Sequence, residues 1–169
     1  PAGSNGLVLL PYFLGERSPI WDSDARGVLV GMSMATTRAD VVRAILEGTA
    51  YGMNHNLEEM RRLGIAPPAL RVVGGGARGR TWNQIKADVL GVPVLQVPGD
   101  ATAAGVAMLA GIGAGVYSGP GEAVAAACHP AEPVLPEPAS AERYDDVYQR
   151  YRAVLASGLA RVRTPEAAG

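Results

Sequence analysis

The sequence is poor in the residues that most often build metal centres and covalent cross-links. Cys128 is the only cysteine among 169 residues, which excludes an intrachain disulfide and a zinc site made of cysteines. The two histidines, His55 and His129, lie far apart in the sequence, and neither has a partner at the spacing of a metal ligand. We therefore expect no metal site in this chain.

Long apolar runs and an excess of positive charge are also missing. No stretch of 18 apolar residues occurs, so we expect no membrane-spanning helix, and no signal peptide is recognisable. The formal net charge of −1 argues against a nucleic-acid-binding surface. Of the 15 basic residues only Lys86 is a lysine, and the others are arginines.

What is present is the composition of an ordinary folded domain. Hydrophobic residues make up 48% of the chain and charged residues 18%, and 169 residues suffice for one domain with a core. The chain begins at Pro1 rather than at methionine, so we expect it to be a piece of a longer protein. Residues 164–169 are predicted to form a frayed tail.

The first part of the chain predicts two strands followed by a long helix. Leu7–Leu10 and Val28–Met32 are short apolar runs bounded by proline or glycine. Residues 15–27 are dense in charges and turn formers, which predicts an ordered loop. Thr37 and Asp40 have the spacing of a capping box and predict the start of the helix.

The following part alternates between strands and helices. Strands are predicted at Leu70–Val73 and Val92–Val97, and a helix is predicted at Thr81–Leu90 between them. Asp100 is the predicted N-cap of a further helix, and Ala101–Val116 is expected to be buried because of its low polarity. This order predicts a βαβ unit with parallel strands, and hence an α/β fold.

The last part predicts two more helices. A short one is expected at Glu122–Cys128, and four prolines within residues 130–138 indicate an extended segment. Ser140 is the predicted N-cap of the final helix. One face of that helix carries Tyr144, Tyr148, Tyr151 and Leu155, a spacing that predicts core packing rather than a cofactor site.

The glycine-rich turn between strand 70–73 and the next helix is the most informative segment. Residues 74–76 are three consecutive glycines, and Gly79 follows. Glycine is needed where φ is positive or where another group approaches the backbone closely, and free N–H groups at a helix start favour an anion. A tight turn that binds nothing is the alternative, but three successive glycines after a strand favour a binding site.

Spacing alone leaves the ligand of this turn open. Gly74, Gly76 and Gly79 match the G-x-G-x-x-G pattern of Rossmann dinucleotide-binding proteins, and Asp100 follows about 20 residues later. Asp100 nevertheless suits a helix N-cap better than the end of a strand. A Walker A loop is excluded because no G-K-[ST] occurs, whereas a turn that holds the adenosine side of ATP remains open.

Five segments carry a family resemblance. They are LPYFLGERSPIWDSDARGVLVGM (10–32), RAILEGTAYGM (43–53), GGGARGRTWNQIKADVLGVPV (74–94), DATAAGVAMLAG (100–111) and YDDVYQRYRAVL (144–155). In this order they resemble the C-terminal part of the FGGY family of carbohydrate kinases, and its xylulokinase branch most closely. The resemblance covers residues 5–163.

The resemblance implies an actin-like, ribonuclease-H-like ATPase fold. Residues 1–163 are then the C-terminal half of a two-domain sugar kinase, incomplete at its N-terminal side. The missing domain would hold the sugar, the catalytic aspartate and the Mg²⁺-linked phosphate site. The nucleotide-binding turn of the family falls here on Gly74, Gly75, Gly76, Ala77 and Gly79. Glycerol kinases have an asparagine where Gly79 stands, so no side-chain hydrogen bond is expected from that position.

The same resemblance implies the activity. The chain would be the ATP-binding half of a cytoplasmic enzyme that transfers the γ-phosphate of ATP to a sugar hydroxyl, in a pentulose such as xylulose. We expect no catalytic residue and no metal ligand within it, and no activity from it alone. Its expected partners are ATP, the sugar through the missing domain and a second copy of the full-length enzyme, with no nucleic acid or membrane. Two alternatives stay open, a Rossmann-type fragment and a non-catalytic binding module of the same fold.

Two groups of charges in the first 66 residues have a structural and a functional interpretation. The loop charges Glu16, Arg17, Asp22, Asp24 and Arg26 suit either a cleft loop that faces the missing domain or a loop paired within itself around Trp21. Glu47 lies in an apolar helical stretch and is predicted to pair with an arginine.

Four further residues are assigned by their place on predicted helices. Lys86 and Asp88 are expected to be solvated or paired structurally. Trp82 is expected to pack behind the glycine turn or to form a wall of an adenine pocket. His55 is expected on a polar helix face rather than in catalysis.

Overall fold

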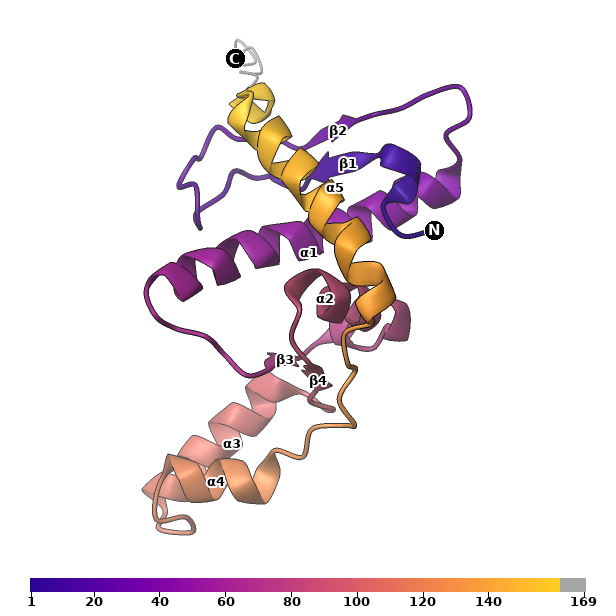
Figure 1. Ribbon diagram of the computed structural model, residues 1–169. Helices are drawn as coiled ribbons and strands as arrows, with labels where there is room; N and C mark the ends of the chain where they lie inside the picture. The colour runs from indigo at the N-terminus through magenta and orange to yellow at the C-terminus, as the bar shows by residue number, and fades with distance from the viewer. Residues whose placement is uncertain (162–169) are drawn as a thin grey trace. The chain divides into compact units, whose positions relative to one another are not determined.

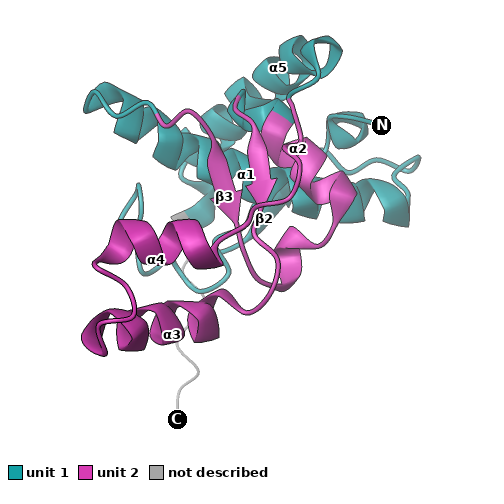
Figure 2. Ribbon diagram, turned by 90° about the horizontal axis from the view of Figure 1, so that it is seen from below, with its two compact units in different colours: residues 1–66, 88–91, 136–169 teal, residues 67–87, 92–135 magenta. Residues whose placement is uncertain are grey.

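The computed structural model describes residues 1–161 and divides into two compact units (Figures 1 and 2). Unit 1 is formed by residues 1–66 and 88–91 and by the chain from residue 136, and unit 2 by residues 67–87 and 92–135. Each unit is described by itself. The predicted tail at residues 164–169 lies outside the described residues.

Unit 1 packs two helices against a two-stranded sheet. Its elements are the 3₁₀ turn Ser4–Gly6, β1 (Val8–Leu10), β2 (Val28–Val30), α1 (Arg38–Arg62), α5 (Pro138–Ala156) and the 3₁₀ turn Leu159–Arg161. β1 and β2 are antiparallel, with Leu9 opposite Leu29. Both helices contact β1 and each other (Figure 1), so the core of this unit lies between them and the sheet.

The start, the end and the packing of α1 all follow from local sequence. The capping box is present, because the Thr37 side chain accepts from the Asp40 N–H while the Asp40 carboxylate accepts from the Thr37 N–H. Gly64 follows the helix with φ +80°, which a glycine adopts easily. A Cβ on Gly48 would lie 2.5 Å from the Leu9 carbonyl oxygen, so this small residue lets α1 approach β1.

The tyrosines of α5 form the core of unit 1, as their spacing predicts. Tyr144, Tyr148 and Tyr151 are buried and surround Tyr51 of α1, whose ring centre is 5.6 Å from that of Tyr151. The hydroxyls of Tyr12 and Tyr151 are hydrogen-bonded to each other. Burial raises the pKa of Tyr144 to about 12, so its hydroxyl stays protonated and can donate.

The predicted N-cap of α5 at Ser140 is wrong. The helix begins at Pro138, its N-cap is Glu137, and no side chain caps it. Proline suits the first helical position because its fixed φ is already helical and its missing N–H needs no partner there. The Glu137 N–H instead donates to the carboxylate of Asp88 at 2.8 Å.

Unit 2 contains the predicted βαβ unit. Its elements are β3 (Leu70–Val72), the 3₁₀ turn Gly75–Ala77, α2 (Arg80–Leu90, of which the part up to Ala87 belongs here), β4 (Val94–Gln96), α3 (Ala101–Gly113) and α4 (Pro120–Ala127). β3 and β4 are parallel, with Leu70 opposite Val94. Val134 continues the sheet by exchanging two backbone hydrogen bonds with Val94, each of 2.9 Å.

The expected burial of residues 101–116 is not observed. The side chain of Asp100 caps α3 as predicted, accepting from the Thr102 and Ala103 N–H groups. No residue of α3 is buried, however, and Val106 and Leu109 are 63% and 69% exposed. An apolar helix is suited to burial, but its sequence does not say which segment covers it, and here it packs against α4. None of the helices within residues 1–161 is long and apolar enough to span a membrane.

Candidate functional site

The glycine turn lies at the edge of the sheet where ligands of α/β folds bind. It directly follows the C-terminal end of β3, and β4 leads into Asp100 and α3 at the same edge because the two strands are parallel. Open α/β sheets bind their ligands outside the carboxyl ends of their strands. The prediction that the turn occupies this edge is confirmed.

The three successive glycines are required for different reasons. Gly74 has φ +79° and ψ −170°, a region open essentially to glycine alone. A Cβ on Gly76 would lie 2.8 Å from an atom of the Trp82 ring. Gly75 has no positive φ, and a Cβ there would have nothing within 4 Å. No contact or positive φ within residues 1–161 therefore demands glycine at position 75.

The backbone of the turn is closed on one side and open on the other. The Ala77 N–H donates to the Gly74 carbonyl and the Arg78 N–H to the Gly75 carbonyl, both at 3.2 Å. The N–H groups of Gly75 and Gly76 have no acceptor in the described part of the chain, and both residues are exposed. These two N–H groups are available to an external acceptor.

Three side chains of α2 support the turn from behind. Asn83 is 3% exposed, and its amide donates to the Ala77 carbonyl at 2.7 Å. The Lys86 ammonium lies 3.3 Å from the Asn83 side-chain oxygen, 3.4 Å from the Gly76 carbonyl and 4.3 Å from the centre of the Trp82 ring. The prediction that Trp82 packs behind the turn is confirmed by its contact with Gly76.

The environments of Lys86 and Asn83 differ most from what the sequence indicates. Lys86 is 5% exposed, so the prediction that it is solvated is wrong. Burial alone lowers the pKa of Lys86. The sequence patterns assign no role to Asn83. The signal that could have found it is its position one turn before Lys86 on the helix that follows the glycines. Asp88 is also buried and paired, since it accepts from the Glu137 N–H.

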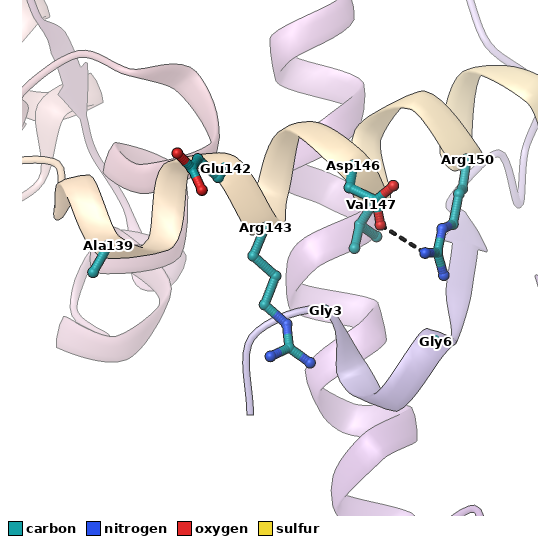
Figure 3. A pocket seen from close by; sticks show the side chains of 8 residues that line it. All are labelled: Gly3, Gly6, Ala139, Glu142, Arg143, Asp146, Val147 and Arg150. Atoms are coloured by element: carbon teal, nitrogen blue, oxygen red, sulfur yellow. Dashed lines mark hydrogen bonds and ion pairs between the residues drawn. The ribbon is translucent and has the colours of Figure 1, made fainter.

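Both units contain cavities, and Gly74, Gly75 and Gly76 line none of the four described. In unit 2, a cavity of about 360 Å³ lies beside the turn and is lined by Arg78, Arg80, Asn83, Gln84, Gln96 and residues 131–134. In unit 1, a cavity of about 580 Å³ is lined by residues of the N-terminal segment and of α5, whose side chains Figure 3 shows. Its lining includes the ion pair Asp146–Arg150, at 2.6 Å, and none of the predicted site residues.

Glu47 of unit 1 is the centre of a structural network. It is 1% exposed and forms the predicted ion pair with an arginine, Arg43, at 2.8 Å. It also accepts from the Gly3 N–H, the Ser4 hydroxyl and the Tyr144 hydroxyl. Its carboxylate is thus fully engaged in joining the N-terminal turn, α1 and α5.

The expected position of His55 on a polar face is wrong. Its side chain is buried between α1 and α5, because its helix face is turned toward the tyrosine core rather than toward water. Its Nε2 lies 4.0 Å from a carboxylate oxygen of Glu59, and burial lowers its pKa.

The loop at residues 15–27 is paired within itself, but not around Trp21. Glu16 and Asp22 exchange two backbone hydrogen bonds, and the Arg26 guanidinium donates to the Ser23 carbonyl at 3.0 Å. Trp21 is 81% exposed and does not hold the loop. Within residues 1–161, no group of three or more His, Cys, Asp or Glu side chains could hold a metal ion.

The fold and the turn define the class of protein: an α/β domain with a glycine turn open at the ligand edge of a parallel sheet. Residues 1–114 match the C-terminal domain of the FGGY family of carbohydrate kinases. The chain belongs to this family, and its fold is the actin-like ATPase fold of these kinases.

Similar proteins include kinases for different substrates. The chain is 33% identical to the xylulose kinase of Bacillus subtilis over 153 residues, which are 90% of this chain and 31% of that protein. It is 39% identical to a glycerol kinase of Saccharolobus islandicus over 117 residues, 68% of this chain and 23% of that protein. The crystal structure of xylulose kinase from Rhodospirillum rubrum has a TM-score of 0.80 and 38% identity, covering 94% of this chain and 32% of that one. The chain thus spans about a third of the length of the xylulose kinases it matches.

Proposed function

We propose that this chain forms the adenosine-binding side of an ATP-dependent carbohydrate kinase, with the nucleotide lying against Gly74, Gly75, Gly76, Ala77 and Gly79. The observation that carries this proposal is Gly75, whose missing side chain faces open space at the ligand edge of the sheet. The neighbouring free N–H groups of Gly75 and Gly76 suit an acceptor on the nucleotide. Family membership supports ATP as that nucleotide.

The Rossmann-type alternative is not favoured. In that fold the acidic residue at the end of the second strand binds a ribose hydroxyl. Here Asp100 lies beyond the end of β4 and caps α3, its Oδ1 accepting from the N–H groups of Thr102 and Ala103. The turn itself therefore accounts for the G-x-G-x-x-G pattern.

The acceptor is proposed to be a sugar hydroxyl, in a pentulose such as xylulose, and the reaction transfers the γ-phosphate of ATP to it. Similarity to xylulose kinases supports the pentulose. Such a transfer uses Mg²⁺, and the described residues contain no group of three or more His, Cys, Asp or Glu side chains that could hold it. We assign Mg²⁺ and the catalytic base to no residue of this chain. A cytoplasmic location and a homodimer of the full-length enzyme stay proposals that rest on the resemblance.

Amide-resolved NMR of the ¹⁵N-labelled chain tests the nucleotide assignment. We expect ADP and ATP to shift the amide signals of Gly75 and Gly76 first, and the Gly75→Val variant to lose these shifts. Saturation-transfer spectra with NAD⁺ should show contact at the adenosine protons and not at the nicotinamide protons. Shifts confined to unit 1, or contact with the nicotinamide ring, contradict the proposal.

A further inference from the structure

Lys86 is a buried cation without an acidic partner. It is the only lysine of the chain, and 5% of its surface is exposed. The groups that face its ammonium are the Trp82 ring and the Asn83 amide from α2 and the Gly76 carbonyl from the turn, and none of these titrates. Buried charges are normally paired, because removing a charge from water is costly. A cation kept here without a carboxylate therefore needs a reason.

The position of Lys86 supplies that reason. Its ammonium, which comes from α2, lies 3.4 Å from the Gly76 carbonyl, while Gly74, Gly75 and Gly76 are themselves exposed. Asn83 completes this support by holding the next carbonyl, that of Ala77. A ligand that approaches the exposed glycines has the buried positive charge directly behind the peptides that it touches. Because burial weakens solvent screening, this charge acts on the ligand more strongly than the exposed arginines do.

We propose that Lys86 is a positioning residue that makes the turn selective for the anionic phosphates of a nucleotide over uncharged adenosine. It does so by fixing the Gly76 peptide and by placing a positive charge behind it, and this charge has no anionic partner until a nucleoside di- or triphosphate binds. This inference rests on the proposed function of the turn and extends it to the charge of the ligand.

Two consequences separate this role from ordinary packing. Removing the charge should weaken binding of the anionic ligand without weakening the fold, because the free chain loses a buried cation that no carboxylate offsets. Binding of an anion should in turn favour the protonated ammonium, since coupling between two bound species is reciprocal. Burial lowers the pKa of Lys86 in the free chain, so ADP should raise it and adenosine should not.

The single lysine makes a direct test practicable. In a chain labelled with ¹³C- and ¹⁵N-lysine, one side-chain signal is followed against pH alone, with saturating ADP and with saturating adenosine. We expect ADP to raise the pKa of Lys86 and adenosine to leave it unchanged. We expect Lys86→Met and Lys86→Gln to weaken ADP binding about fivefold and adenosine binding less than about twofold, with no loss of melting temperature. Arg71→Gln, which removes the same charge from an exposed position on β3, is the control and should leave ADP affinity unchanged.

The outcomes distinguish the inference from the function on which it rests. If ADP fails to shift the amides of Gly75 and Gly76 in the parent chain, the proposed function fails and the inference fails with it. If those amides shift but the pKa of Lys86 does not change, Lys86 only packs, and the inference alone is overturned. If the Lys86 variants bind ADP and adenosine equally more weakly than the parent chain does, the inference alone is likewise overturned.

Discussion

At the scale of single residues, the glycines of the turn show how one residue type serves unlike needs. Gly74 provides a backbone conformation, and Gly76 provides room for Trp82. Gly75 provides neither, and we propose that its absent side chain leaves room for a ligand. The sequence predicts the turn and its place after a strand, but it cannot sort these three reasons, because the sorting depends on which atoms surround each Cα.

The first prediction separates these roles. Gly75→Val should leave the melting temperature unchanged and weaken ADP binding by more than about tenfold, because the new side chain fills space that the nucleotide needs. Gly76→Val should lower the melting temperature instead, since its Cβ meets the Trp82 ring. Calorimetry and NMR titration measure the two effects. Gly121→Val, at an exposed glycine of α4 with open space around it, is the control. Unchanged ADP affinity in Gly75→Val contradicts the assignment of the turn.

The second prediction concerns the buried carboxylate of Glu47. Glu47→Gln removes a charge that is held by Arg43 and three other donors, so the free energy of unfolding should fall by about 3 kcal/mol. Urea denaturation measures it, and Glu142→Gln, at an exposed position of α5, is the control. Equal stabilities of the two variants show that the network contributes nothing. An apolar context predicts that such a carboxylate needs an arginine, but not its partners at Gly3, Ser4 and Tyr144, which are far away in sequence.

The third prediction follows from the buried His55. Burial lowers its pKa, so the unfolded chain binds its proton more readily than the folded chain does. The stability that this group contributes is complete above its ordinary pKa of about 6.5 and is lost as the pH falls through its lower folded value. The His55→Gln variant should therefore lose less stability than the parent chain between about pH 7 and pH 5. His129→Gln, at an exposed histidine, should follow the parent. Identical pH dependence in the parent and His55→Gln excludes the effect.

At the scale of secondary-structure elements, local signals predict well and distant neighbours do not. The capping residues Thr37 and Asp100 act within three residues of themselves, and the structure confirms both. Ser140 fails as a cap because Pro138 competes as a helix start only two residues away. The prediction that α3 is buried fails because burial depends on a segment that covers the helix. The apolar composition of the helix carries no information about that segment.

The fourth prediction tests the close approach of α1 to β1. Gly48→Ala places a Cβ 2.5 Å from the Leu9 carbonyl, so the helix must move, and the free energy of unfolding should fall by about 2 kcal/mol. Gly52→Ala, one turn later, meets only the Tyr151 hydroxyl at 3.7 Å. It should be neutral, or more stable by up to about 1 kcal/mol, because alanine is the better helix former. Denaturant titration of both variants measures their free energies of unfolding. Equal values for the two variants would show that α1 does not approach β1 closely at Gly48.

At the scale of the whole molecule, the edge that we propose for the nucleotide lies in a unit with few carboxylates. The chain spans about a third of the xylulose kinases it matches. Unit 2, which carries the turn, has only three carboxylates among its residues: Asp100 caps α3, Glu122 accepts from Ser118, and Glu132 lines the cavity with Arg78 and Arg80. We therefore expect none of them to act as a base on a sugar hydroxyl or to hold a metal on the phosphates.

The last prediction is that the chain binds nucleotide weakly and phosphorylates no sugar by itself. A few backbone N–H contacts, adenosine contacts and one buried cation support about 4–5 kcal/mol, which corresponds to a dissociation constant near or just below about 1 mM. Sugar should not change this affinity, because the family resemblance assigns the sugar site to the other domain of the kinase. NMR titration with ADP, with and without xylulose, measures the affinity, and a coupled ADP-release assay on a panel of pentuloses measures the activity. Sugar-dependent release of ADP above that of the Gly75→Val variant, prepared in parallel, would place a catalytic residue within these 169 positions and overturn this division of roles.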